Sequence, residues 1–154
     1  MLRDGTIQRW RDAGADALVI DGSSMLFSPT EIAFEPNGDI YVYNSAPKVL
    51  VKFAPDGTVL DHWDLYVAPA GLAAAPGGGI VIADYGSFAV GRITGAGVAT
   101  LIPPNPTPAL RGFRPSGVAV APDGTVYAST DGVNGGTRAP AIVSVDQEGL
   151  HQLR

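Results

Sequence analysis

The chain carries one motif three times, and this repeat constrains its fold more than any other feature. Each copy reads as an opening Pro, a short apolar run, a Pro-x-Gly turn and a second run rich in Val, Ile and Tyr. The copies are SPTEIAFEPNGDIYVYNS, APAGLAAAPGGGIVIADY and RPSGVAVAPDGTVYASTD, spaced 40 and then 46 residues apart. The matched positions are Pro29, Pro69 and Pro115; Ala33, Ala73 and Ala119; Pro36, Pro76 and Pro122; and Gly38, Gly78 and Gly124. Because Pro presets φ and Gly permits a positive φ, each copy predicts a β-hairpin.

Two further apolar runs follow each hairpin. The third runs are KVLVKF (48–53), FAVGRI (88–93) and AIVSV (141–145), and the fourth are TVLDHWDL, VATLI and LHQL. Each repeat therefore holds four strands with no helical periodicity between them. A β-sandwich would explain many short strands but not the four-strand period. We expect an all-β fold of β-propeller blades, each a four-stranded antiparallel sheet.

The repeat sets the expected domain organisation. We predict one propeller segment over residues 1–154: an outer strand and linker (1–28), then blade 1 (29–68), blade 2 (69–114) and blade 3 (115–154). RDGTIQRW (3–10) matches PDGTVLDHW (55–63), so the extra N-terminal strand is the outer strand of a blade.

Three blades leave strand edges and blade faces exposed, because known propellers close with four to eight blades. The segment is therefore a partial or half propeller. It belongs to a longer propeller chain, or two chains self-associate into a six-bladed ring, or the loose outer strand completes a neighbouring blade.

Charge and hydropathy limit the partners. The net charge is −5 with no basic run, which disfavours nucleic acid and anionic membranes. No apolar run reaches the ~18 to 20 residues of a membrane helix, and the first residues lack the pattern of a secretory signal peptide. We expect a soluble protein. The absence of cysteine leaves its compartment open.

The repeats resemble known propeller blades. PSGVAVAPDGTVYAST and PTEIAFEPNGDIYVYNS resemble NHL repeats, and the stretch containing VGRITGAG resembles a repeat of the streptogramin lyase group. The gluconolactonase group (SMP-30 type) is similar in its general blade. The resemblance implies a propeller fold but several functions, because such blades serve binding, lactone hydrolysis and lyase chemistry alike.

Carboxylates near the predicted channel mouth are the candidates for metal and catalysis. Glu31 stands where the other copies have Gly71 and Gly117, so we expect it near the channel. Asn44, Asp84 and Thr130 stand six residues after the turn Gly of each repeat, and Asp131 follows Thr130. An all-oxygen set of Glu31, Asn44, Asp84 and Asp131 would suit Ca²⁺ or Mg²⁺, with Glu31 and Asp131 as candidate catalytic groups. The alternative is structural, because Asp and Asn at such positions bond nearby backbone N–H groups.

Two irregular loops interrupt the repeat and are candidates for ligand contact. They are PPNPTPALRGFR (103–114) and DGVNGGTRAP (131–140), and the candidate contact residues in them are Arg111, Arg114, Asn134 and Arg138. Arginines among Gly and Pro suit a carboxylate or phosphate group. His62 and His151 fall in predicted outer strands, which disfavours histidine-based catalysis.

The sequence leaves three functions open. The first is a binding or interaction module that presents loops and a channel mouth to a small molecule or protein. The second is part of a metal-dependent, gluconolactonase-like hydrolase, in which the metal polarises a lactone or ester carbonyl. A streptogramin lyase-like enzyme is the third.

Overall fold

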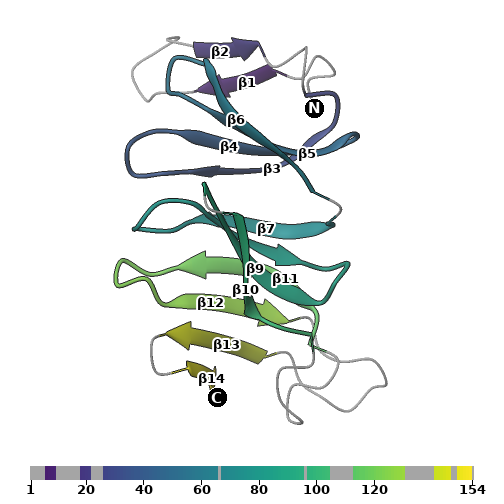
Figure 1. The fold of residues 1–154 in the computed structure, drawn as a ribbon, viewed down its shortest axis with the longest axis vertical. Coiled ribbons are helices and arrows are strands. Elements are labelled where there is room, and N and C mark those ends of the chain that lie inside the picture. Colours follow the sequence, from purple (N-terminus) through teal and green to yellow (C-terminus); the bar gives the residue numbers. More distant parts are fainter. Residues whose placement is uncertain are drawn as a thin grey trace. The chain divides into compact units, whose positions relative to one another are not determined.

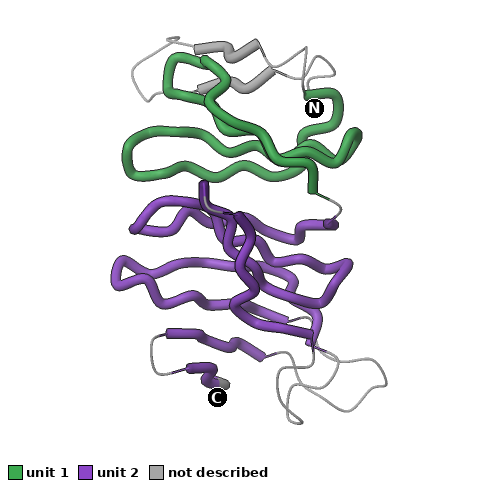
Figure 2. The backbone as a smooth tube through the Cα atoms, viewed as in Figure 1, with its two compact units in different colours: residues 1–66 green, residues 67–154 purple. Residues whose placement is uncertain are grey.

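A computed structural model describes residues 6–9, 18–21, 26–65, 67–95, 97–104, 113–130, 141–146 and 149–153. Every regular element within these ranges is a β-strand (Figure 1). None of the described segments is a helix that could span a lipid bilayer. The chain divides into two compact units, residues 1–66 and 67–154 (Figure 2). The division falls just before Pro69, where the sequence predicted that blade 2 begins.

The first unit contains blade 1 and an N-terminal hairpin. Blade 1 is a four-stranded antiparallel sheet in sequence order, formed by β3 (Pro29–Phe34), β4 (Ile40–Ser45), β5 (Lys48–Phe53) and β6 (Val59–Asp64). The predicted N-terminal strand is present as β1 (Thr6–Arg9). It pairs antiparallel with β2 (Leu18–Asp21), so the segment 1–28, expected to be an outer strand and a linker, holds a second strand that the sequence analysis did not predict.

The second unit contains the other two blades. Blade 2 is formed by β7 (Pro69–Ala74), β8 (Ile80–Asp84), β9 (Ala89–Thr94) and β10 (Gly97–Ile102). Blade 3 is formed by β11 (Pro115–Val120), β12 (Val126–Thr130), β13 (Ala141–Asp146) and β14 (Gly149–Leu153). All three sheets confirm the predicted blades, and His62 and His151 lie in the outer strands β6 and β14, as expected.

The turn chemistry explains why these strands form hairpins. Gly38, Gly78 and Gly124 have φ of 92°, 85° and 91°, a region that residues with a Cβ rarely adopt. In each turn the Gly N–H donates to the carbonyl three residues earlier, at 2.9 Å in all three blades. The repeated Pro-x-Gly is therefore required by backbone geometry.

Blades 2 and 3 pack face to face in the second unit. The innermost strands β7 and β11 are neighbours (Figure 1), and a Cβ added at Gly71 would lie 3.3 Å from the Val118 backbone nitrogen. The shared core is formed by residues Ala75, Val81, Val90, Ile102, Phe113, Val126, Ala128 and Val143. We call the face of blade 2 that carries Val81 and Val90 its trailing face. The face of blade 3 that carries Val126 and Ala128 is its leading face.

A partly buried ion-pair cluster joins the hairpin turn of blade 1 to its third strand. Lys52 Nζ lies 2.9 Å from Glu35 Oε2 and 2.8 Å from Asp39 Oδ2. The same ammonium lies 5.2 Å from the centroid of the Tyr41 ring, and the Tyr41 hydroxyl donates to Glu35 Oε1 at 3.3 Å. The sequence analysis did not identify this cluster.

Candidate functional site

A polar residue at or next to the end of the second strand has the equivalent backbone partner in each blade. Asn44 Oδ1 accepts the N–H of Ser28 at 2.6 Å, and Asp84 Oδ1 accepts the N–H of Ala68 at 2.9 Å. Thr130 Oγ1 accepts the N–H of Arg114 at 3.4 Å. The donor is always the residue just before the opening Pro of that blade. The three side chains therefore fix the start of the innermost strand to the end of the second strand, which is the structural role that the sequence left open.

Asn44 and Asp84 make further bonds of the same kind. The Asn44 side-chain amide donates to the carbonyl of Pro47 at 2.8 Å, and Asn44 is fully buried. Asp84 also accepts the N–H groups of Gly86 and Ser87, at 2.9 and 3.2 Å. Burial by itself raises the pKa of Asp84, but the hydrogen bonds from Ser87, Ala68 and Gly86 outweigh it and lower the pKa. Asp84 is therefore a buried, ionised turn residue.

The predicted metal set is only partly described. Glu31 lies half-buried on β3, opposite Tyr43, and burial raises the pKa of its carboxyl. Asn44 lies in the first unit and Asp84 in the second, and Asp131 lies outside the described residues. Within the described ranges no three His, Cys, Asp or Glu residues are grouped to hold a metal. The Ca²⁺ or Mg²⁺ site and the catalytic roles of Glu31 and Asp131 stay predictions.

Arg114 is the one predicted ligand-loop residue that falls in the described ranges; Arg111, Asn134 and Arg138 lie outside them. Its guanidinium carbon lies 4.9 Å from the centroid of the Phe88 ring and 5.7 Å from that of Tyr85. Its Nη1 donates to the Tyr85 hydroxyl at 3.2 Å. The two rings meet edge to face, with centroids 6.3 Å apart. We call Tyr85, Phe88 and Arg114 the Arg114 cluster.

The sequence analysis missed the two aromatic members of this cluster. Tyr85 and Phe88 lie in the turn between β8 and β9, within the stretch DYGSFAV, which breaks the apolar pattern of the repeat. Phe88 has a positive φ of 60°, uncommon for a residue with a large side chain. The sequence analysis placed Phe88 at the start of the third run, FAVGRI, whereas β9 begins at Ala89 and Phe88 lies in the turn.

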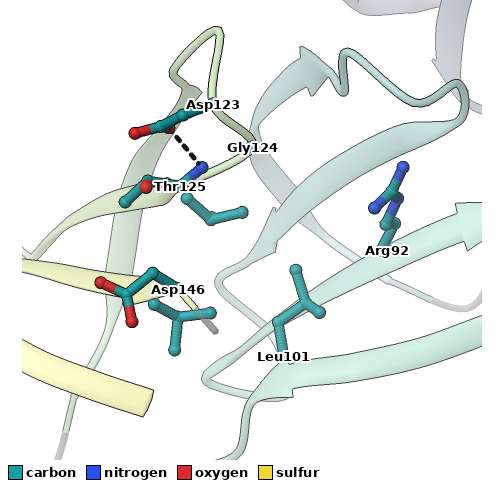
Figure 3. A pocket seen from close by; sticks show the side chains of 8 residues that line it. Arg92, Leu101, Asp123, Gly124, Thr125 and Asp146 are labelled. Atoms are coloured by element: carbon teal, nitrogen blue, oxygen red, sulfur yellow. Dashed lines mark hydrogen bonds between the residues drawn. The ribbon is translucent and has the colours of Figure 1, made fainter. Parts of the chain in front are cut away.

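A hollow of about 610 Å³ lies at the ends of β8 and β9 that are opposite to the Arg114 cluster (Figure 3). Arg92 and Leu101 line it from blade 2, Asp123 lines it from the turn between β11 and β12, and Asp146 from the end of β13. Arg92 Nη2 donates to the carbonyl of Gly78 at 2.6 Å. Asp123 accepts the N–H of Thr125 at 2.9 Å, and Asp146 that of Gly149 at 3.1 Å. Each of these three residues holds a turn, and Arg92 Nε is in addition buried without a hydrogen-bond partner among the described residues.

Several solved propeller proteins share this fold. A streptogramin B lyase matches with a TM-score of 0.68 and 19% identity, over 97% of this chain and 48% of that one. A virginiamycin B lyase from Staphylococcus aureus matches with a TM-score of 0.67 and 19% identity, over 98% of this chain and 49% of that one. A gluconolactonase from Xanthomonas campestris matches with a TM-score of 0.65 and 16% identity, over 82% of this chain and 47% of that one.

No family model matches the sequence, and no curated protein matches it either. The chain spans about half the length of the solved structures named above. These structures bear out the likeness to streptogramin lyase and gluconolactonase blades that the repeats suggested. The chain has the fold of a partial β-propeller.

Proposed function

We propose that this chain is a binding module that recognises an anionic group, a carboxylate or phosphate, on a small molecule or protein. The observation that carries the proposal is the Arg114 cluster, in which a guanidinium is fixed against two aromatic rings at the blade surface. Tyr85 is exposed, and its hydrogen bond with Arg114 lies at the surface.

The chemistry of guanidinium explains why this arrangement suits an anion. The group carries five N–H donors in one plane, and stacking on aromatic rings holds that plane while leaving its edge for a bidentate carboxylate or phosphate. Because the side chain is already held in place, it loses less conformational entropy when an anion binds. The net charge of −5 gives anions no general attraction to this protein, so a fixed local cation would supply the specificity.

The position of the cluster in the chain supports the same proposal. Arg114 is the last residue of the irregular loop 103–114, and Thr130, which accepts its backbone N–H, directly precedes the loop 131–140. The two predicted ligand loops therefore meet the described structure beside the cluster. Their residues Arg111, Asn134 and Arg138 are additional candidates for ligand contact.

We expect Arg114→Gln to weaken the binding of inorganic phosphate and of succinate about 10-fold or more, because one charge-assisted pair is lost. Arg114→Lys keeps the charge but loses the planar donor pair, so its binding should fall between wild type and Arg114→Gln. Calorimetry or NMR titration measures the affinities. The matched control is Lys48→Gln, an exposed cation in blade 1, which should bind as wild type. Equal affinity of wild type and Arg114→Gln for both anions would rule out the cluster as the site.

A metal-dependent hydrolase is the second candidate, and Glu31 is the observation that favours it. Its carboxyl is half-buried and its pKa is raised by that burial, which makes it a stronger base than an exposed glutamate. We expect wild type to bind Ca²⁺ or Mg²⁺ in calorimetry and Glu31→Gln to lose at least 10-fold in affinity. Glu35→Gln is an unsuitable control because Glu35 pairs with Lys52, so the exposed Asp61→Asn serves instead. A wild type that binds neither cation would remove this candidate.

A further inference from the structure

A blade does not need an arginine at the position of Arg114. Arg114 stands directly before the opening Pro of blade 3, and the same position holds Ser28 in blade 1 and Ala68 in blade 2. In all three blades this residue donates its backbone N–H to the side chain near the end of the second strand. Because a small side chain serves the other two blades, the blade geometry does not account for the guanidinium of Arg114.

The repeat does not require the two aromatic rings either. By strand register, Tyr85 and Phe88 occupy the turn positions that Ser45 and Lys48 occupy in blade 1. Phe88 has a φ of 60°, and in the part of the chain that the structure describes every other residue with a positive φ is a glycine. A residue with a Cβ is strained in this conformation, so glycine would suit the turn better than Phe. Such strain is typical of functional sites, where the side chain is needed at that place.

Hydrogen bonds fix the turn that carries both rings. Asp84 accepts the N–H groups of Gly86 and Ser87 within the turn. The backbone N–H of Tyr85 donates to the carbonyl of Ala68 at 3.0 Å. The rings are therefore held in place before a ligand binds, which lowers the entropy that binding costs.

The packing of blades 2 and 3 leaves the side chain of Tyr85 accessible. The trailing face of blade 2 and the leading face of blade 3 bury the shared core, whose residues are at most 5% exposed, whereas Tyr85 is 41% exposed. The Tyr85 hydroxyl accepts a hydrogen bond from Arg114 Nη1 at 3.2 Å, and a phenol that accepts can also donate its own hydrogen. An exposed aromatic ring thus lies beside a fixed guanidinium and a hydroxyl donor.

We propose that the Arg114 cluster recognises an aromatic anion, a phosphate or carboxylate carried directly on a planar ring. This inference rests on the proposed function and adds the part of the ligand that lies next to the charge. The guanidinium binds the anionic oxygens, and the ligand ring packs against Tyr85 in the offset or edge-to-face arrangements that aromatic pairs favour. An inorganic anion would leave the Tyr85 ring in water and gain only the charged contact.

Matched pairs of anions test the proposal on the whole 154-residue chain. Phenyl phosphate is compared with inorganic phosphate, and benzoate with acetate, by calorimetry or NMR titration. We expect the anion that carries a ring to bind about 5-fold more tightly in at least one pair, because an aromatic contact adds affinity of that order. The pair that shows this preference identifies the anionic group. Equal affinities within both pairs would overturn the proposal.

Two substitutions that both remove the hydroxyl isolate the contribution of the Tyr85 ring. Tyr85→Phe keeps a ring, so the preference should persist, whereas Tyr85→Leu should reduce the preference to less than about 2-fold. The matched control is Tyr127→Leu, which removes a tyrosine of blade 3 that is 36% exposed and should keep the wild-type preference. A preference that survives Tyr85→Leu would show that the ligand ring binds elsewhere.

The affinity itself and the preference for a ring separate this inference from the proposed function. Arg114→Gln should weaken the binding of both members of each pair in parallel. If the anions bind through Arg114 with no preference for a ring, the aromatic ligand is wrong and the anion site stands. If wild type binds none of the four anions, or Arg114→Gln binds them all as tightly as wild type, the proposed function is wrong and this inference fails with it.

Discussion

Replacing Lys52 by Met will lower the free energy of unfolding by about 2–4 kcal/mol, because two largely buried carboxylates lose their cation. Lys52 Nζ lies within 3 Å of both Glu35 Oε2 and Asp39 Oδ2. Without the ammonium, these two acidic groups repel each other at the hairpin turn of blade 1, and the Tyr41 ring loses its cationic neighbour. Urea unfolding followed by circular dichroism measures the change.

Lys48→Met is the control for this substitution, since Lys48 is an exposed lysine on the same strand. It should change the free energy of unfolding by no more than about 0.5 kcal/mol. If the two variants lose the same stability, the ion-pair cluster contributes nothing beyond the loss of a surface charge.

The pH dependence of the same variant is a separate expectation. The hydrogen bond from Lys52 lowers the pKa of Asp39 below its usual 3.8, so the stabilisation is present above that value and is lost as pH falls through the folded pKa. Burial lowers the pKa of Lys52, but the bonds from Asp39 and Glu35 outweigh it and raise the pKa above 10.5. The stabilisation that the Lys52 ammonium contributes is lost only as pH rises through the raised pKa of Lys52. The stability difference between wild type and Lys52→Met should therefore be constant from about pH 5 to 9 and shrink below about pH 4. A difference that persists unchanged at pH 2 would contradict the ion pair.

The blades were predictable because their signals are local. Pro-x-Gly fixes a hairpin within a few residues, and the runs around it supply the strands, so KVLVKF was predicted at the same residues as β5. β2 was missed because Leu18–Asp21 lies beside no repeated turn motif and matches no strand of the repeat. Local sequence patterns are therefore enough to predict the blades. A strand outside the repeat, such as β2, can be predicted only if its pairing partner is known.

The side-chain clusters could not be predicted, because each joins residues that are distant in sequence. Lys52 meets Glu35 across 17 residues, a contact that depends on the register of β4 against β5. Arg114, which directly precedes the first strand of blade 3, meets Tyr85 of blade 2 across 29 residues. The sequence analysis could select Arg114 by its residue type and loop, but the aromatic rings beside it follow only from how the two sheets pack.

The polar residues near the ends of the second strands could be interpreted in two ways from the sequence. Their side-chain oxygens suit a metal ion, but they also suit hydrogen bonds from backbone N–H groups. Asn44, Asp84 and Thr130 differ in chemical type, which made two of them candidate metal ligands. The structure gives all three one backbone role, since each accepts the N–H that precedes the opening Pro of its blade. This position therefore requires a side-chain oxygen that accepts a hydrogen bond, and it does not require a charge.

Asp84→Ala will therefore lower the free energy of unfolding by about 2–4 kcal/mol, since it leaves the N–H groups of Ala68, Gly86 and Ser87 without their acceptor beside a buried strand end. Asp84→Asn should lose less, because its amide oxygen can still accept from Ala68 and Gly86 while its NH₂ faces the Ser87 N–H. Asp123→Ala removes one bond to an exposed turn and should change stability only slightly.

Urea unfolding of these variants in EDTA separates the structural role of Asp84 from metal binding. The bonds that lower the pKa of Asp84 stabilise the fold above the usual value of 3.8, and this contribution is lost as pH falls through the folded pKa. The deficit of Asp84→Ala should thus be complete at pH 7 in EDTA and smaller at pH 3. A deficit that appears only when Ca²⁺ or Mg²⁺ is added would instead identify Asp84 as a ligand, because a metal that binds only the folded state stabilises it in proportion to its occupancy.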